Sequence, residues 1–434
     1  MAAAPMIPTC APLVELVSPI PPMRTGTANY LGTVLKRVSA IPGCAALMRV
    51  VIDSNFLPAS EAPHQLHGVS VCDFNHMPQE VPIGSTRILF LANNDHHAYV
   101  LAALARQTSR AHGKVIVVIH DPATFMINRF MVGNGEYRLT LDQLEQAASL
   151  QYRSATKRLV GSRLAGHMPD IFEFVTHCQQ LALTKAHEIW VHSLFGLAKL
   201  ICESDLPAHQ FPKIRVCAHP HSPAEEAPPA TPAKLGLRIG VFGWVTPPKR
   251  VTAVIRGLSL ALDRLGPDDD CRIELLVVGR RPPESAYDPA RDAERFDVAD
   301  RVRFIDYPSD EEFTRLQSSC QLIFNLRFPS CGETSGTLSS AEATSANIVT
   351  SRYQSFHEGN EGHRTITILP IFEDWDIAAA ICEAYEQRLG AGTTAKPTAD
   401  RGPAICPIEK LLLHEILERR QAVRDSAERG ADLA

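Results

Sequence analysis

The sequence lacks the patterns that mark several large classes of protein. No apolar run approaches the roughly 20 residues that a membrane-spanning helix needs. No Lys/Arg-rich run occurs, and the formal net charge is −5, from 43 Lys and Arg against 48 Asp and Glu. Nucleic-acid binding needs a basic surface. We therefore expect neither a bilayer span nor a nucleic-acid partner, and peripheral contact with a membrane stays open.

Cysteine and glycine patterns exclude further classes. The 11 cysteines are scattered without a CxxC pair or any clustered ligand spacing, so we expect free thiols and no bound metal. The glycine fingerprint GxGxxG is also absent, which disfavours an NAD-dependent enzyme. Residues 1–12 are rich in Ala and Pro without a positively charged start, so we expect no secretory signal. These features together favour a cytoplasmic protein.

Short apolar runs, many rich in Val and Ile, alternate with longer amphipathic stretches along the whole chain. This pattern is typical of parallel sheets covered by helices on both faces. The runs that we expect to be strands are 13–17, 47–52, 88–91, 115–119, 189–191, 239–242, 273–278, 302–305, 322–326, 348–350 and 365–369. The fold class is therefore α/β, with doubly wound sheets.

A Pro/Ala-rich stretch, SPAEEAPPATPAK, interrupts this pattern at residues 222–234. Proline fits poorly into a packed helix or strand, so the stretch predicts an exposed linker. It separates a first domain, residues 1–221, from a second, residues 235–404. Residues 405–434 follow, and apolar spacing from Ile408 to Leu417 predicts a helix that packs on its own domain or returns to the first.

Ligands of doubly wound sheets bind where parallel strands end. After the first expected strand, Gly26 lies where a loop turns into a helix, so backbone amides there could approach a phosphate, or the glycine could serve a plain turn. His120 and Asp121 end another strand. His120 could bind a substrate hydroxyl, share a proton with a carboxylate, or brace its loop. His96 and His97 suit the bracing role better.

The second half carries two further strand-end segments. In GWVTPPKR, Lys249 follows a strand by a short loop and can neutralise a diphosphate, with Arg250 assisting or facing solvent. In NLRFPSCGETSGTLSSAE, a helix is expected to start near Thr334 or Ser335, where amides and hydroxyls could hold a phosphate. Glu333 beside a phosphate is repulsive unless it binds something else, such as sugar hydroxyls.

In this order, the segments SPIPPMRTGTANY, NNDHHAY, HD, EIWVHS, FGWVTPPKR and LRFPSCGETSG resemble the family-4 glycosyltransferases over residues 13–360. The resemblance implies a GT-B fold, with two Rossmann-like domains facing across a cleft. It also implies a retaining, metal-independent transfer from a nucleotide-sugar donor. No cofactor is implied beyond that co-substrate.

The resemblance also implies roles for individual residues. His120 and Glu333 would contact the donor sugar, and Lys249 would bind the diphosphate. The other donor-binding residues would be Gly26, Arg250, Arg327, Thr334, Ser335, Gly336 and Glu342.

Two departures from the family pattern affect the expected site. Trp244 stands where the family commonly has Arg. The diphosphate therefore lacks one cationic contact unless Arg327 or Arg250 supplies it. Glu333 and Glu342 flank eight residues instead of seven, which turns the second glutamate by about 100° on a helix and puts Ala341 in its usual place.

The leading hypothesis is therefore a glycosyltransferase that moves a hexosyl or related group. The acceptor would be a glycan, a lipid-linked glycan or a small molecule. Two alternatives stay open. One is a nucleotide-sugar epimerase of the same fold, which would require additional acid/base carboxylates near the sugar. The other is a binding protein that kept the fold without catalysis.

Overall fold

The computed structural model divides into two compact units. The first comprises Met1–Pro220, Cys331–Glu333 and Ile405–Ala434, and the second comprises His221–Ser330 and Thr334–Ala404. The expected linker, residues 222–234, lies outside the described part of the chain. The residues that the structure describes are 13–23, 25–58, 61–107, 113–133, 137–220, 236–266, 273–281, 287–306, 308–358, 364–366, 373–389 and 406–431.

The first unit is built on an eight-stranded sheet with the order β3-β4-β2-β1-β5-β6-β7-β8. Every neighbouring pair is parallel except β3 with β4. The strands are β1 (Val14–Val17), β2 (Met48–Ile52), β3 (Gln65–Leu66), β4 (Val69–Asp73), β5 (Thr86–Leu91), β6 (Lys114–Ile119), β7 (Glu188–Val191) and β8 (Lys213–Val216).

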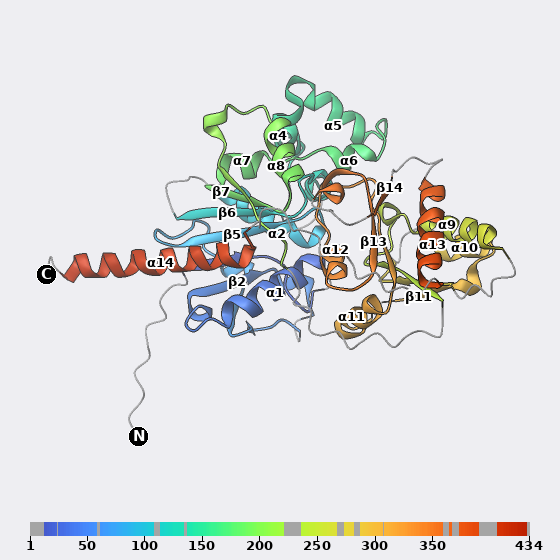
Figure 1. Ribbon diagram of the computed structural model, residues 1–434. Helices are drawn as coiled ribbons and strands as arrows, with labels where there is room; N and C mark the ends of the chain where they lie inside the picture. Colours follow the sequence, from blue (N-terminus) through green and yellow to red (C-terminus); the bar gives the residue numbers. More distant parts are fainter. Residues whose placement is uncertain are drawn as a thin grey trace. The chain divides into compact units, whose positions relative to one another are not determined.

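Helices cover both faces of this sheet (Figure 1). One face packs on α1 (Gly26–Ser39) and α14 (Ile408–Ala431), and the other packs on α2 (Ala98–Arg106), α3 (Phe125–Met131), α7 (Gln180–Lys185) and α8 (Leu194–Cys202). Between β6 and β7 the chain also inserts α4 (Leu141–Tyr152), α5 (Thr156–Leu164) and α6 (Ile171–Val175), which share a small core of their own around Phe125 and Phe172.

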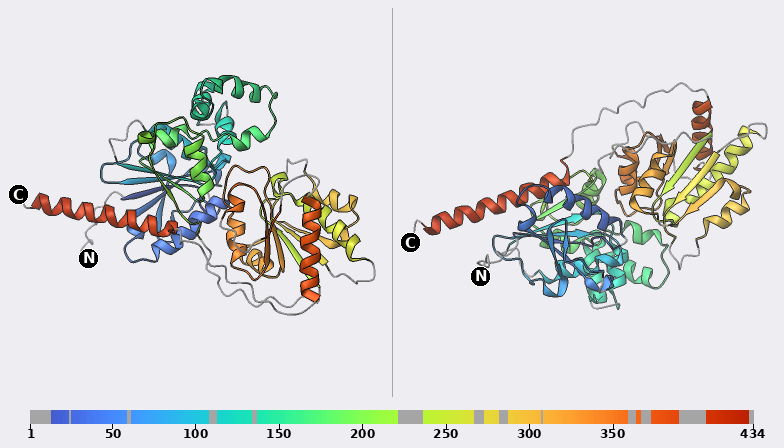
Figure 2. Two further views of the ribbon diagram at one scale, coloured as in Figure 1. Left: turned by 45° about the horizontal axis from the view of Figure 1, so that its top comes forward. Right: turned by 90° about the horizontal axis from the view of Figure 1, so that it is seen from below.

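Helix α14 is fixed to the first unit by a buried carboxylate. Glu415 is 2% exposed and accepts hydrogen bonds from Thr86 Oγ1 (2.5 Å), Lys114 Nζ (2.5 Å) and Arg419 Nε (3.0 Å). Burial opposes its charge, but these donors outweigh burial and lower its pKa below the usual value. Helix α14 lies beside α1 and continues past the sheet (Figures 1 and 2).

The second unit has a six-stranded sheet, all parallel, with the order β11-β10-β9-β12-β13-β14. The strands are β9 (Leu237–Phe242), β10 (Ile273–Val278), β11 (Val302–Ile305), β12 (Leu322–Asn325), β13 (Asn347–Ser351) and β14 (Arg364–Ile366). One face packs on α9 (Val251–Leu265), α10 (Pro289–Arg295) and α13 (Glu373–Leu389), and the other on α11 (Asp310–Ser318) and α12 (Gly336–Glu342) (Figure 2).

Ten of the eleven expected runs overlap strands at near-identical positions, and the eleventh, 365–369, is a strand as far as the structure describes it, to Ile366. Three strands of the first sheet were missed: β3 and β4 at one edge, and β8 at the other. Edge strands such as KIRV are half-exposed and alternate apolar with charged residues, so they leave no continuous apolar run. The strand ending at Leu91 is consequently the fifth, not the third.

Candidate functional site

The predicted residues follow the central strands of each sheet. In the first sheet the strand order reverses between β1 and β5, and in the second between β9 and β12. Such switch points are where doubly wound sheets bind ligands, because the connections leave in opposite directions and open a crevice. Gly26 follows β1, His120 follows β6 beside β5, Lys249 follows β9, and the segment from Arg327 to Ser335 follows β12.

In the second unit, Lys249 is joined to the segment after β12 by hydrogen bonds. The lysine is 5% exposed, and its Nζ donates to the Phe242 carbonyl (2.9 Å) and to Thr337 Oγ1 (3.3 Å). Thr337 and Ser335 hydroxyls both donate to Asn325 Oδ1, over 3.1 and 3.2 Å. Residues far apart in sequence thus form one cationic and hydroxyl-rich cluster at the ends of β9 and β12.

Asn325 is the centre of this cluster and was missed by the sequence analysis. It is 4% exposed, and its Nδ2 has no hydrogen-bond partner among the residues that the structure describes. An unsatisfied buried amide is costly, so such a donor is suited to a ligand oxygen. His120 was identified because it follows a strand, whereas Asn325 is the last residue of β12 and lies inside the expected run 322–326, so reading only the residues after each strand passed over it.

The expected helix start is confirmed at Ser335, which caps α12. Its side chain accepts a hydrogen bond from the backbone N–H of Leu338 (3.2 Å), and Gly336, the first helical residue, is exposed. Ala341 is fully buried in the core between α11, α12 and the sheet. Glu342, the last residue of α12, is half-buried. The residue at the family's usual spacing is therefore a core residue in this chain.

Two arginines proposed for the diphosphate have other partners. Arg250 has a left-handed backbone (φ +59°), and its guanidinium binds both carboxylate oxygens of Glu373, which is fully buried. Hydrogen bonding to that carboxylate raises the pKa of Arg250. Arg327 lies with its guanidinium carbon 5.6 Å from the centre of the Phe356 ring, and its backbone N–H donates to Ser351 Oγ (2.8 Å).

In the first unit, His120 belongs to a cluster of aromatic rings. Its side chain packs edge-on against Tyr30, with ring centres 4.5 Å apart, and its ring centre is 5.3 Å from that of His192. Tyr30 also contacts His219. His120 is 8% exposed, and its Nε2 has no hydrogen-bond partner within the described ranges. Asp121 accepts a hydrogen bond from the backbone N–H of Asn93 (2.5 Å).

Burial keeps these imidazoles neutral. It lowers the pKa of His120 well below the usual value, with a smaller effect from the neighbouring histidines. It lowers the pKa of His192 to about 4 and that of His97 to about 3. Neutral His192 donates from Nδ1 to the Cys217 carbonyl (3.1 Å) and accepts from the Tyr30 hydroxyl (3.1 Å) at Nε2. His120 thus offers an uncharged donor or acceptor, depending on its tautomer.

Gly26 opens α1, and Thr25 caps that helix by accepting from Ala28 N (3.0 Å). A Cβ at Gly26 would meet nothing within 4 Å, so the space beside this turn is open. His97 braces the turn, because its Nδ1 donates to the Phe90 carbonyl (2.7 Å) and its Nε2 accepts from Thr27 Oγ1 (2.8 Å). Both of its nitrogens are therefore used, as the bracing interpretation requires.

Glu333 and Thr334 lie on the loop between β12 and α12 and are both half-buried. Glu333 groups with the first unit, as His120 does, whereas Thr334 groups with the second.

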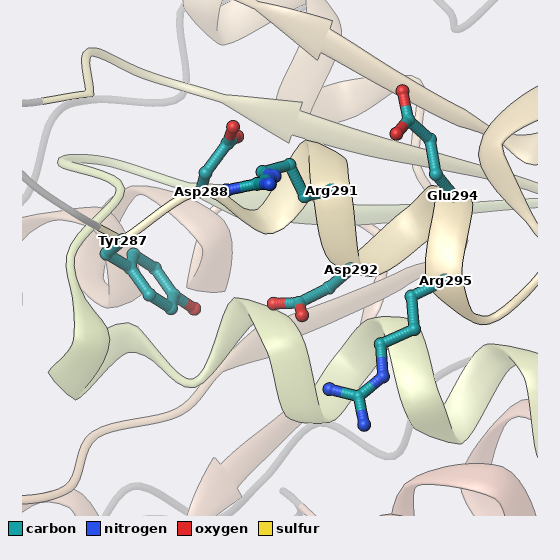
Figure 3. A pocket seen from close by; sticks show the side chains of 6 residues that line it. All are labelled: Tyr287, Asp288, Arg291, Asp292, Glu294 and Arg295. Atoms are coloured by element: carbon teal, nitrogen blue, oxygen red, sulfur yellow. The ribbon is translucent and has the colours of Figure 1, made fainter.

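A surface hollow of about 710 Å³ lies elsewhere on the second unit, along α10 (Figure 3). Tyr287 and Asp292 in its lining share a partner on α9, because the Thr252 hydroxyl donates to Asp292 (2.6 Å) and the Thr252 backbone N–H donates to the Tyr287 hydroxyl (3.0 Å). The remaining lining residues are charged side chains of both signs: Asp288, Arg291, Glu294 and Arg295. None of the predicted site residues lines this hollow.

Within the described ranges, no group of three or more His, Cys, Asp or Glu residues is arranged to hold a metal ion. No described helix combines the length and the apolar character that crossing a membrane requires.

No family model matches the chain, and no curated protein matches it in sequence. Solved structures do match it in fold. HepE from Anabaena, in complex with UDP and glucose, is 14% identical, covers 96% of this chain and 100% of its own, and gives a TM-score of 0.55. Sucrose-phosphate synthase from Thermosynechococcus elongatus is 13% identical, with coverage of 96% and 100% and a TM-score of 0.54.

A third match is an α,α-trehalose-phosphate synthase (UDP-forming) from Burkholderia xenovorans, in complex with glucose-6-phosphate. It is 9% identical, covers 96% of this chain and 99% of its own, and gives a TM-score of 0.55. The chain therefore has the GT-B fold, with two Rossmann-like units built on parallel sheets.

Proposed function

We propose that this protein is a retaining glycosyltransferase that takes a sugar from a nucleoside diphosphate-sugar donor. The observation that carries the proposal is the cluster of Lys249, Thr337 and Asn325 at the β9/β12 switch point. With the neighbouring Ser335 it combines a buried cation, two hydroxyls and an open amide donor, and these groups match the oxygens of a diphosphate. The solved structures of HepE hold UDP or UDP-glucose, which is consistent with such a donor.

In this proposal Lys249 and the hydroxyl and amide groups around Ser335 and Gly336 stabilise the negative charge that develops on the leaving diphosphate. Electrostatic stabilisation of this kind is a large part of many rate enhancements. Thr334 and Gly26 add backbone contacts to the same group. Arg250 and Arg327 act on the donor only if the salt bridge to Glu373 or the contact with Phe356 is exchanged for the ligand.

The donor sugar is contacted by His120 and Glu333. A neutral imidazole with an open Nε2 can hydrogen-bond a sugar hydroxyl without adding a charge. Glu333 accepts hydrogen bonds from other hydroxyls of the sugar, and Glu342 contacts the nucleoside. The chain as a whole splits into a first domain of residues 1–221 and a second of 235–404, joined by 222–234, with residues 405–434 completing the first domain. Metal independence, cytoplasmic location and the acceptor remain predictions.

The test is binding followed by turnover. Isothermal titration with UDP, GDP and ADP identifies the nucleotide, and each matching donor sugar is then incubated with the protein while nucleotide release is followed. The proposal requires saturable binding of one nucleoside diphosphate and slow release of it from one donor. Failure of all three nucleotides to bind at millimolar concentration contradicts it.

A further inference from the structure

Two glycines bring the loops after β9 and β10 into direct contact. Gly243 follows β9 and Gly279 follows β10, and the N–H of Gly243 donates to the Val278 carbonyl (2.9 Å). Both glycines have positive φ, +99° and +145°. A Cβ on Gly279 would lie 2.0 Å from the carbonyl oxygen of Gly243, so no other residue fits. The residues after the two glycines, Trp244 and Arg280, are consequently neighbours.

Arg280 lies over the indole of Trp244. Its guanidinium carbon is 6.0 Å from the centre of that ring, and the N–H of Val245 donates to the Arg280 carbonyl (2.9 Å). Trp244 is 43% exposed, although it is a large apolar residue at the carboxyl end of a central strand. Tryptophan is the aromatic side chain that attracts a cation most strongly. The contact therefore favours conformations of Arg280 in which the guanidinium lies over the indole.

The charge of Arg280 is not neutralised by a described carboxylate. Its neighbour Arg281 pairs with Asp288 over 3.0 Å, whereas no ion pair of Arg280 exists in the ranges that the structure describes. Lys249 is adjacent, because its Nζ would lie 3.2 Å from a Cβ on Gly243. Lys249 is thus a buried cation beside Gly243, and Arg280 is a second cation over the exposed indole of the next residue, Trp244.

We propose that Arg280, positioned by Trp244, is the second cationic contact to the diphosphate of the donor. A diphosphate presents several oxygens, and a planar guanidinium binds two of them at once where an ammonium binds as a point charge. Resting on Trp244 limits the conformations of Arg280 before the ligand arrives, which reduces the entropy lost on binding. This inference rests on the proposed function and assigns residues that the sequence pattern did not.

The experiment uses the full-length protein and calorimetry with the nucleoside diphosphate that binds the wild type, together with the matching monophosphate and free nucleoside. We expect Arg280→Ala to weaken the diphosphate about 10-fold or more and to leave the nucleoside unchanged, since a charge-assisted contact is lost. Arg280→Lys recovers part of the loss. Arg281→Ala is the matched control and binds like the wild type.

The role of Trp244 is tested by comparing Trp244→Leu in the presence and in the absence of the Arg280 side chain. Trp244→Leu weakens the diphosphate several-fold when Arg280 is present and has no effect in an Arg280→Ala background. Adding Trp244→Arg to Arg280→Ala restores binding, because it returns a guanidinium to the adjoining position. The inference is overturned if Trp244→Leu lowers the affinities for the nucleoside and for the diphosphate equally in both backgrounds. The indole would then contact the base of the nucleotide.

These measurements also distinguish failure of the role of Arg280 from failure of the proposed function. If Arg280→Ala binds the diphosphate like the wild type while Lys249→Ala does not, the inference is wrong and the proposed function stands. If the wild type binds no nucleoside diphosphate, both are wrong. Melting temperatures within a few degrees of the wild type exclude unfolding as the cause of any loss.

Discussion

The ammonium of Lys249 donates a hydrogen bond to the hydroxyl of Thr337 over 3.3 Å, although the two residues are 88 positions apart. This contact joins the end of β9 to the first turn of α12 in the second unit. It places a buried cation beside hydroxyls and a free amide donor, and it is the feature from which the proposed donor site follows.

Lys249→Ala is expected to weaken binding of the nucleoside diphosphate by roughly 10- to 150-fold, because a hydrogen bond to a charged group contributes about 1.5–3 kcal/mol. Calorimetry measures the loss. Arg303→Ala is a suitable control, since Arg303 is an exposed cation of the same unit on β11. Unchanged affinity in Lys249→Ala rules out the diphosphate role.

Glu333→Gln keeps the size of the side chain and removes its charge. We expect free nucleoside diphosphate to bind as in the wild type, because it lacks the sugar that Glu333 contacts. Turnover of the intact donor falls on the order of 100-fold, since a positioning contact at the reacting centre is lost. If Glu333 only orders its loop, melting temperature and nucleotide affinity fall together instead, and full activity removes the sugar-binding role.

Acid should destabilise the first unit through its buried histidines. The pKa of His192 is about 4 in the folded protein against 6.5 when unfolded, so the unfolded chain binds more protons between these values. Stability is therefore full above pH 6.5 and falls as pH drops toward 4, by about 3 kcal/mol for this residue at 1.36 kcal/mol per pKa unit.

The matched variant is His192→Asn, which retains a donor for the Cys217 carbonyl and does not titrate. Urea unfolding between pH 7.5 and 4.5 should show a shallower loss of stability than in the wild type. His414→Asn on α14 serves as the control, because the His414 side chain is 69% exposed. An identical pH dependence in wild type and His192→Asn contradicts the assignment.

The attachment of α14 to the first unit depends on Glu415. Glu415→Ala leaves Lys114 without its 2.5 Å partner and removes the acceptor of Thr86, so we expect a loss of about 2 kcal/mol of unfolding free energy. Urea unfolding measures it. Glu418→Ala, in which the side chain replaced is 53% exposed, should change stability little. Equal stability of both variants means that the attachment of α14 does not depend on Glu415.

The buried parts of this fold could be predicted from the sequence. Strands such as β6 and β10 are apolar on both faces, so their runs are continuous and unambiguous. Reading the residues after β6 and β9 identified His120 and Lys249. Strands β4 and β8 could not be found this way, because half-exposed strands carry polar residues in alternation.

The contacts between distant residues could not be predicted. Nothing in the sequence relates Tyr30 to His192 or Trp244 to Arg280, since these pairs meet only once parallel strands have aligned their ends. The partner of Arg250 was missed for the same reason, because Glu373 is 123 positions away. Asn325 was missed because it is the last residue of its strand, and only the residues after each strand were considered.

The most direct test of sugar transfer with retention is the anomeric form of the first product. The protein is incubated with its α-linked donor and no acceptor, and the released sugar is observed by proton NMR before it equilibrates in water. The account predicts the α-anomer of the unchanged sugar together with the nucleoside diphosphate, and much slower release in Lys249→Ala at the same donor concentration. Early appearance of the β-anomer contradicts retention, and an epimerised sugar or the absence of any release contradicts the proposed transfer.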